Sequence, residues 1–510
     1  MTKKAPKTPK APRKKHVTLI NSICSLLLQV VTIISGFIIP KLILSTFGSE
    51  TNGLVTSLNQ FLNYVSLLEG GLNSVIMSSL YKPLAERDYE KVSSIIRTST
   101  RFFRHISYIF VGYTIILSIA YPLISNSSFS FGFICSLTMI LSIRLFCQYC
   151  FSFSYKNLLN ASKNGYIVSI SQIILVTLNI IAAIVIVKFF PSIHILKLAT
   201  ACIYIIQPIV YTRAVNRLFK LNKHAKPDSK LIANRWDGLS INIAYFIHSN
   251  TDVTLLTIFT NLRTVSVYGV YGLVASGITK LINAFNGGIG PSIGNLYAQG
   301  DKEKLNDRFD LFEYTNFAFV AFMFGMGILL VTPFVMIYTH NITDTDYFQP
   351  IFGVLFLLSE AVYSIRDPYV RLSYSAGRFK DLSKPAFIEA IMNIVISLIL
   401  VNFLGLIGVA IGTLISMSYR TAFQIIYLRK HILHRPVRKF IKRFLVFFTP
   451  IALAMVACFI FLPVTEFTIK SWIIHAVIYA VIIIAIIAAV SLTYFHTELR
   501  SLRKYLKHHN

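Results

Sequence analysis

Long apolar runs alternate with short polar segments along almost the whole chain. A run of about 20 apolar residues can cross the ~30 Å hydrocarbon layer of a membrane as a helix. Fourteen candidate runs lie at about residues 17–44, 50–81, 102–124, 129–154, 165–187, 192–214, 239–262, 265–296, 312–339, 347–373, 383–402, 405–428, 443–463 and 471–495. We therefore expect an all-α polytopic membrane protein with about fourteen transmembrane helices.

Lysine and arginine residues gather in alternate connecting segments. With the N-terminus placed in the cytoplasm, 39 of the 49 basic residues fall in segments on the cytoplasmic side. The segments 123–130 and 340–346, on the opposite side, contain none. Cytoplasmic loops collect basic residues, and an odd number of spans would break this alternation. The pattern predicts fourteen spans with both termini in the cytoplasm, in the cytoplasmic membrane of a bacterial cell.

A weak internal repeat runs through the first twelve spans. Gly53 and Gly269 match at an offset of 216 residues, and Asn179 and Asn393 match at an offset of 214. A steady offset over six spans indicates a duplication, and because six is even, both copies cross the membrane in the same direction. We expect two six-helix lobes related by an axis along the membrane normal. The predicted parts are a basic cytoplasmic tail, the N-terminal lobe, a basic cytoplasmic linker, the C-terminal lobe, two additional helices and a second basic tail, at 1–16, 17–214, 215–238, 239–428, 429–495 and 496–510.

Composition excludes several classes of function. The 510 residues are 55% hydrophobic, and the formal charge of +28 comes from basic residues between the apolar runs rather than on one face. A nucleic-acid partner is therefore not expected. The chain contains no glycine-rich phosphate loop and no His, Cys and Asp cluster with metal-binding spacing, so we expect neither an enzyme nor a bound cofactor or metal.

Two neighbouring spans carry ionisable residues near their centres, Asp252 in 239–262 and Lys280 in 265–296. A charge at the membrane centre costs about 2.5–3.5 kcal/mol on insertion scales, so it should face protein or water rather than lipid. Ser276, Lys280, Asn283 and Gly287 recur at helical spacing and form one polar stripe. Lys280 either neutralises Asp252 or serves a ligand.

Polar stripes occur on other spans as well. Arg144 and Gln148 lie on the fourth span, and Glu360, Ser364, Asp367 and Arg371 on the tenth. Several polar spans predict a polar interior, which is typical of a transporter or channel. For Asp367 with Arg371, mutual pairing is the favoured interpretation. For Glu389 and Arg420 a structural role is favoured, either by pairing or by snorkelling to the membrane surface. Arg144, Asp252 and Lys280 favour a cavity role, whereas Glu69 and Glu360 leave both roles open.

Several short motifs resemble the polysaccharide and oligosaccharide flippases, the Wzx-type members of the superfamily that also contains the MATE exporters and the lipid II flippases. The similar segments, in the family's order, are Phe37–Pro40, Phe47–Leu54, Leu67–Leu72, His248–Asp252 and Ser375–Asp381. This resemblance implies two six-helix lobes around a cavity that alternates between the membrane faces. It also implies a polyprenyl-diphosphate-linked glycan as substrate, and the two extra C-terminal spans are similar to those of fourteen-span members.

The chemistry of such a substrate suits the intramembrane residues. A diphosphate and a sugar oligomer cannot cross hydrocarbon unaided. Arg144, Lys280 and Arg366 are the candidates to hold the diphosphate through charge-assisted hydrogen bonds, with Asn283 for the sugars. Asp252, Glu69 and Glu360 are the candidates for coupling to H⁺ or Na⁺. Membrane lipids surround the protein, which we expect to work as a monomer.

Three alternatives remain open. A flippase for lipid II or a teichoic-acid precursor would need the same basic residues. A MATE-like drug/cation antiporter should have an acidic, aromatic cavity, and the basic Arg144 and Lys280 argue against it. A membrane-embedded polymerase or glycosyltransferase usually needs a large outer loop or a carboxylate-rich cytoplasmic site, and the chain has neither.

Overall fold

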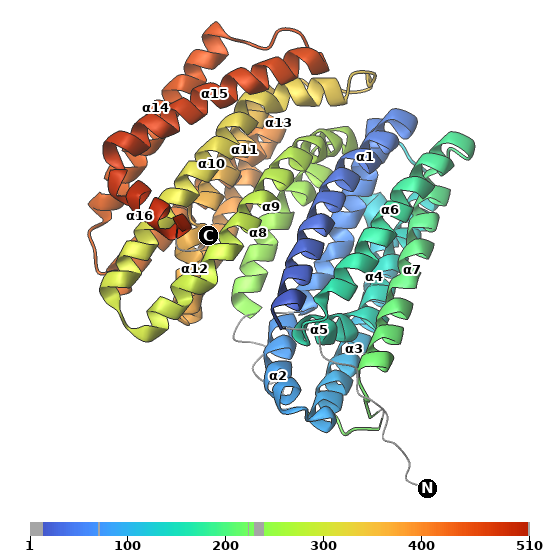
Figure 1. The fold of residues 1–510 in the computed structure, drawn as a ribbon. Helices are drawn as coiled ribbons and strands as arrows, with labels where there is room; N and C mark the ends of the chain where they lie inside the picture. The colour runs from blue at the N-terminus through green and yellow to red at the C-terminus, as the bar shows by residue number, and fades with distance from the viewer. Residues whose placement is uncertain (1–13, 70–71, 223, 229–238, 508–510) are drawn as a thin grey trace. The chain divides into compact units, whose positions relative to one another are not determined.

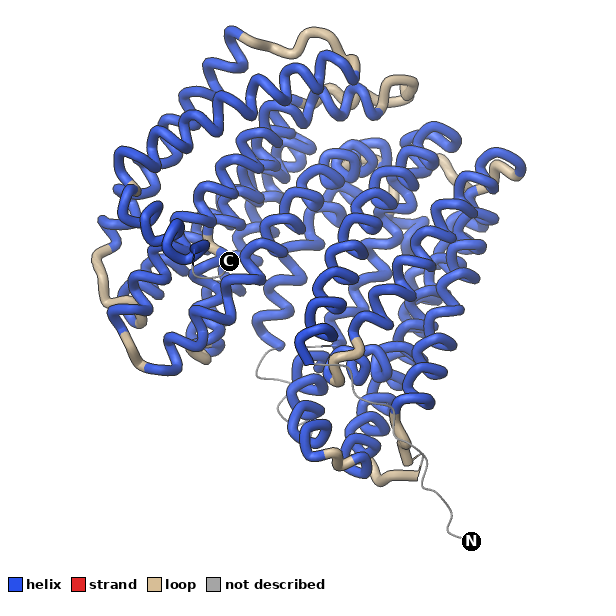
Figure 2. The backbone as a smooth tube through the Cα atoms, viewed as in Figure 1, coloured by secondary structure: helices blue, strands red, loops and turns tan. Residues whose placement is uncertain are grey.

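The computed structural model describes residues 14–69, 72–222, 224–228 and 239–507 (Figure 1). Within these ranges every regular element is a helix (Figure 2). The expected tails 1–16 and 496–510 and the linker 215–238 lie partly outside the described residues. The elements are α1 (Lys14–Asn63), the 3-10 helix η1 (Tyr64–Glu69), α2 (Leu72–Glu86), α3 (Tyr89–Ile124), α4 (Phe131–Cys147), the π-helix η2 (Gln148–Ser152), α5 (Phe153–Ala161), α6 (Gly165–Phe189), α7 (Ile193–Leu218), α8 (Leu239–Phe259), α9 (Leu262–Gln299), α10 (Lys302–Tyr338), α11 (Pro350–Ile365), α12 (Asp367–Ser375), α13 (Phe379–His431), α14 (Val437–Phe461), α15 (Ile469–Tyr494) and α16 (His496–Lys507).

Ten helices in the described part of the chain are long and apolar enough to cross a membrane. Two of them, Leu19–Glu69 and Asp381–His431, each cover two of the predicted spans. They do so because α1 and α13 continue through kinks at Gly48 and Gly405, where the backbone leaves helical geometry. The all-α, multi-span membrane fold is therefore confirmed, and the number of fourteen spans stays a prediction.

The order and bounds of the helices repeat along the chain. α3 begins at residue 89 and α10 at residue 302, an offset of 213, and α6 begins at residue 165 and α13 at residue 379, an offset of 214. The corresponding helix is interrupted in both halves, by η2 between α4 and α5 and by Arg366 between α11 and α12. The helices thus follow the period of the sequence repeat, while the axis that relates the two copies stays a prediction.

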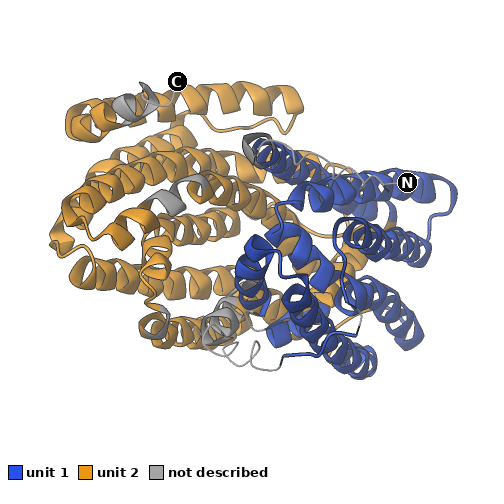
Figure 3. Ribbon diagram, turned by 60° about the horizontal axis from the view of Figure 1, so that its bottom comes forward, with its two compact units in different colours: residues 1–46, 61–123, 128–236 blue, residues 47–60, 124–127, 237–510 orange. Residues whose placement is uncertain are grey.

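The chain folds into two compact units, coloured separately in Figure 3. Unit 1 comprises residues 1–46, 61–123 and 128–236, and unit 2 comprises residues 47–60, 124–127 and 237–510. In unit 1, α7 packs on α4 and α6, and α5 packs on α2 and α6. In unit 2, α13 packs on α8 and α11, while α10 packs on α9, α11 and α15.

The second half of α1 belongs to unit 2 and crosses the start of α9 closely. Gly48 has a φ of 82°, a conformation that favours glycine, and it ends the first half of the helix. Gly53 lies so near α9 that a Cβ atom placed on it would be 1.7 Å from the carbonyl oxygen of Leu262. A Cβ atom on Gly269 would lie 3.6 Å from Thr56 of α1. The two glycines that match in the repeat therefore sit at the same helix crossing.

Asp344, in the loop between α10 and α11, binds α1 next to this crossing. Its carboxylate accepts hydrogen bonds from the backbone N–H of Ser49 at 2.7 Å and from the hydroxyl of Ser49 at 2.6 Å. An acceptor at the first turn after a kink satisfies a backbone donor that the helix cannot. The loop 340–346, identified in the sequence only by its lack of basic residues, thus holds the start of the second half of α1.

Candidate functional site

Asp252 lies on α8 inside unit 2, and only 4% of its surface is exposed. Tyr268 of α9 donates a hydrogen bond to its carboxylate at 3.0 Å. The hydroxyl of Thr413 lies 3.0 and 3.1 Å from the two carboxylate oxygens. Among the described residues these hydroxyl donors, and no basic side chain, meet the carboxylate, so a cost of burial remains if the group is charged.

Asn393 extends this polar site. The kink of α13 at Gly405 turns the helix back on itself, so that Asn393 donates from Nδ2 to the hydroxyl of Thr413 at 2.9 Å. The carbonyl oxygen Oδ1 of Asn393 is buried and has no hydrogen-bond partner among the described residues. Carboxylate, hydroxyl and amide oxygens thus come together from α8 and both halves of α13. We name Asp252, Asn393 and Thr413 the acidic site.

Glu360 lies on α11 in the same unit. Its carboxylate accepts a hydrogen bond from the hydroxyl of Thr279 on α9 at 3.3 Å. Tyr268, which contacts the acidic site, packs its ring 5.0 Å from that of Phe356, one helical turn before Glu360. Unit 2 therefore holds two of the three acidic candidates next to α9, and each is met by hydroxyl donors.

Lys280 lies on α9 in a different setting. It is half-buried and makes no ion pair with any described residue, and Ser276, Asn283 and Gly287 of the same stripe are exposed at the surface of unit 2. Lys280 is twelve residues beyond Tyr268, which corresponds to about 18 Å along a helix. The structure therefore separates Lys280 from the acidic site rather than pairing it with Asp252.

The remaining basic candidate of unit 2 is paired. Arg366 donates to Glu389 at 2.9 Å, and Glu389 also lies 3.8 Å from the guanidinium of Arg420. Arg371 donates to Asp367 at 2.6 Å. The predicted pairing of Asp367 with Arg371 is confirmed, and of the two alternatives for Glu389 and Arg420 the structure shows pairing. Arg366 is buried in this pair, with 6% of its surface exposed, which sets it apart from the exposed Arg144 and the half-buried Lys280.

Unit 1 contains Glu69 at the end of η1. Its carboxylate accepts a hydrogen bond from Asn73 at 2.7 Å and another from the hydroxyl of Tyr149 in η2. Asn157 of α5 donates to Asn73 at 2.9 Å. The two irregular segments η1 and η2 are therefore joined through Glu69, so this acid has a clear structural role beside any coupling role.

Arg144 lies on α4 of unit 1, and it is exposed. Its guanidinium carbon lies 3.8 Å from the centre of the Tyr204 ring on α7, a cation–π contact. Lys197, also on α7, is close enough for the two positive charges to repel each other. Sequence reasoning missed Lys197, although a lysine inside the apolar run 192–214 was a detectable signal.

A second group of charges escaped prediction because its members lie at the ends of the apolar runs or beyond them. Its members come from α10, α13, the segment before α14, α14 and α16. We name it the C-terminal ion network, formed by Asp310, Glu313, Arg429, Arg435, Lys439, Arg443 and Glu498. Each of its four basic residues and three acids is paired with a residue of opposite charge, so the network joins these helices to one another.

Comparison with known proteins identifies the fold. No family model and no curated protein sequence matches the chain. Among solved structures, one described as "Lipid II flippase MurJ, inward closed conformation" matches with a TM-score of 0.69 and 17% identity, over 94% of this chain and 99% of that chain. The chain has the MurJ and MATE transporter fold. The resemblance predicted from the short motifs is thereby confirmed at the level of the fold.

Two MATE structures give weaker matches to the same fold. A multidrug resistance MATE family transporter of the MOP superfamily, in an inward-facing conformation, has a TM-score of 0.56 and 13% identity, over 81% of this chain and 98% of that chain. The eukaryotic MATE transporter AtDTX14 has a TM-score of 0.59 and 14% identity, over 81% of this chain and 96% of that chain.

Proposed function

We propose that this protein is a flippase that moves a polyprenyl-diphosphate-linked oligosaccharide across the cytoplasmic membrane by alternating access, for cell-surface polysaccharide synthesis. The observation that carries the proposal is a division between the basic and acidic candidates. Lys280 and Arg144 lie on accessible stripes without an acidic partner among the described residues, whereas Asp252 is buried and hydrogen-bonded.

The accessible basic residues support an anionic cargo. Both lie within spans, Lys280 in Leu262–Gly287 and Arg144 in Phe131–Ala161. A lysine that is unpaired at this depth is costly in lipid, so its stripe should face a water-filled path. An ammonium group and a guanidinium group on such a path are suited to the two phosphates of the carrier. Asn283, exposed on the stripe of Lys280, offers an amide to the sugars.

The buried acids support coupling to a cation. The acidic site offers a carboxylate, a hydroxyl and the free amide oxygen of Asn393, and oxygen ligands of this kind suit hard cations. A proton on Asp252 would remove the same uncompensated charge. Asp252 is therefore the proposed coupling residue for H⁺ or Na⁺, with Glu360 and Glu69 as secondary candidates. The chain's own contribution is binding and conformational change, and the proposal needs no enzymatic step.

A MATE-like antiporter for organic cations is the second candidate, favoured by its fold and by its buried acids. The two proposals differ in the charge of the cargo. The protein should be reconstituted in liposomes and given either a fluorescent polyprenyl-diphosphate glycan or an organic dye cation. The flippase proposal requires translocation of the glycan and its competition by another polyprenyl diphosphate. Transport of the dye cation alone would overturn it in favour of the antiporter.

The same assay separates the glycan classes. Lipid II and a teichoic-acid precursor carry the same kind of polyprenyl phosphate anchor and differ in the attached group. If all polyprenyl diphosphates compete equally well, whatever group is attached to them, the basic residues determine recognition. If competition follows the attached group, then recognition extends to the sugars and the proposed role of Asn283 is supported.

A further inference from the structure

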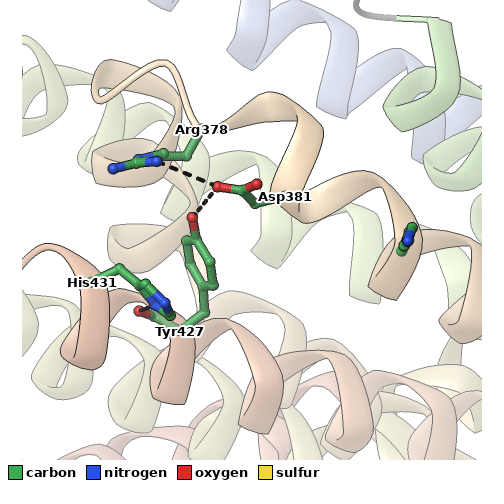
Figure 4. A pocket seen from close by; sticks show the side chains of 5 residues that line it. Arg378, Asp381, Tyr427 and His431 are labelled. Carbon is green, nitrogen blue, oxygen red and sulfur yellow. Dashed lines mark hydrogen bonds and ion pairs between the residues drawn. The ribbon is translucent and has the colours of Figure 1, made fainter.

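A pocket of about 380 Å³ lies at the point where the two ends of α13 meet. Because α13 turns back at Gly405, its first turn and its last turns lie side by side. The pocket is lined by Arg378, Asp381, Lys384, Tyr427 and His431, four of which are labelled in Figure 4. None of the proposed transport residues lines it. The segments 374–385 and 429–443, which contain four of the five lining residues, are predicted to be cytoplasmic.

Positive charge exceeds negative charge in this pocket. Arg378 and Lys384 carry permanent charges, and Asp381 is the one acid in the lining. Asp381 already meets two groups, the guanidinium of Arg378 at 3.6 Å and the hydroxyl of Tyr427 (Figure 4). Lys384 has no ion pair with a described residue and is exposed. The lysine therefore adds a charge that the protein itself leaves uncompensated.

The ion pair of Arg378 with Asp381 is weak, and it is the contact that an anionic ligand would need to replace. The side chains of Arg378 and Asp381 are 48% and 45% exposed. An exposed pair at 3.6 Å contributes about 0–1 kcal/mol, so an anion can take over the guanidinium with little loss. Tyr427 holds Asp381 on the other side and keeps it in place when Arg378 turns away.

Tyr427 and His431 form a flat wall. Their rings are stacked with centroids 4.5 Å apart. The imidazole Nδ1 lies 3.0 Å from the backbone carbonyl oxygen of Tyr427, an acceptor, so Nδ1 carries the proton. This contact fixes the ring and leaves Nε2 as a hydrogen-bond acceptor, which can meet a hydroxyl group of a ligand. Three nitrogen-bearing side chains thus line one small pocket beside the predicted cytoplasmic ends of the spans 383–402 and 405–428.

We propose that this pocket binds a phosphate ester at a site separate from the transport path, with Arg378 and Lys384 holding the phosphate and Nε2 of His431 accepting from a hydroxyl group of the ester. The phosphate of an anionic lipid headgroup and that of a small soluble phosphate ester have the same chemistry, and the test distinguishes them. Basic pockets at the cytoplasmic membrane face are suited to anionic headgroups. A bound headgroup would link the two ends of α13, whose halves also carry Asn393 and Thr413 of the acidic site.

The test measures binding to the purified full-length protein rather than export, so its outcome is independent of the proposed transport function. Phosphatidylglycerol and glycerol 3-phosphate are titrated separately and bound ligand is counted by native mass spectrometry. Each basic residue near a headgroup contributes about a five-fold change in affinity. Arg378→Ala and Lys384→Ala should each weaken phosphatidylglycerol binding by about this factor, and Lys442→Ala, an exposed lysine outside the pocket, should not.

Asp381→Asn gives a change in the opposite direction, because it removes the one negative charge that repels phosphate and should strengthen binding. If the variants change the affinity for glycerol 3-phosphate in the same order as the affinity for phosphatidylglycerol, the pocket binds a phosphate whether or not a lipid tail is attached. If it does not bind, the source is the lipid. Equal phosphatidylglycerol affinity in the wild type, Lys384→Ala and Asp381→Asn would overturn the proposal. Lys384→Ala breaks no described side-chain contact, so the test holds even if the Arg378 variant is poorly folded.

Discussion

Arg429 of α13 donates a hydrogen bond from Nη2 to the carboxylate of Glu313 on α10 at 2.8 Å, and the two side chains are 0% and 1% exposed. Arg443 of α14 reaches the other oxygen of Glu313 at 3.0 Å and also contacts Glu498 of α16. This buried pair is therefore the centre of the C-terminal ion network. Through it, α14 and α16 are joined to α10 and α13 by charge as well as by apolar packing.

Glu313→Gln should strongly destabilise unit 2. Removing one partner of a buried ion pair leaves an uncompensated charge and costs about 3–5 kcal/mol, so the melting temperature in detergent should fall markedly. The matched control is Glu86→Gln in the exposed pair of Lys82 and Glu86, where the side chains are 81% and 55% exposed. Such a pair contributes about 0–1 kcal/mol. Equal melting temperatures for the two variants would contradict a stabilising role of the network.

Gly53→Ala should impair folding, whereas Gly269→Ala should be tolerated. The added Cβ would lie 1.7 Å from a backbone carbonyl in the first case and 3.6 Å from a threonine side chain in the second. Overpacking of this kind costs about 1–3 kcal/mol, and more when backbone must move. Membrane abundance and melting temperature check the difference. A normal Gly53→Ala protein would mean that the crossing between α1 and α9 is looser than described.

Lys280→Ala should abolish glycan translocation while protein abundance stays normal, because Lys280 has no ion pair with a described residue that the substitution would break. Lys280→Arg should retain part of the activity. The double variant Lys280→Ala with Asp252→Asn should not recover, since the two residues lie in separate settings. Translocation in liposomes and abundance in membranes are measured together. Recovery in the double variant would show that Lys280 only neutralises Asp252, and would end its proposed role in substrate binding.

Asp252→Asn should change the ion dependence of transport and leave abundance intact. Asparagine keeps an oxygen for the hydroxyls of Tyr268 and Thr413 but cannot be charged. Translocation is measured across a series of pH values and Na⁺ concentrations, with Asp346→Asn in an exposed loop as the control. A variant that responds to pH and Na⁺ as the wild type does would return Asp252 to a purely structural role.

The topology can be tested with reporter fusions. Fusions ending in 123–130 and 340–346 should report the outside of the cell, and fusions ending in 220–230 and 430–440 the cytoplasm, because the basic residues concentrate in the latter. A cytoplasmic signal from 340–346 would contradict the fourteen-span topology. That loop contains Asp344, which accepts a hydrogen bond from Ser49 in the second half of α1. The side of the membrane on which the loop lies is therefore also the side of the kink at Gly48.

Much of the fold follows from the sequence. Apolar runs of sufficient length determine that helices cross the membrane, because an unpaired backbone is too costly in hydrocarbon. The repeat offset anticipated where helices begin, as α6 and α13 show. Local spacing also identified the pair Asp367 and Arg371, since residues four apart on a helix are neighbours whatever surrounds them.

Only the tertiary structure decided which distant charges meet. Hydropathy placed Asp252 and Lys280 on adjacent spans, so the sequence allowed an ion pair between them. In the structure α8 packs against α13, and Asp252 is hydrogen-bonded to Thr413 instead. Glu313 and Arg429 lie 116 residues apart in the sequence. No helical period relates them, because a buried charge finds its partner through the packing of separate helices, and that information resides in the whole fold rather than in any segment of the chain.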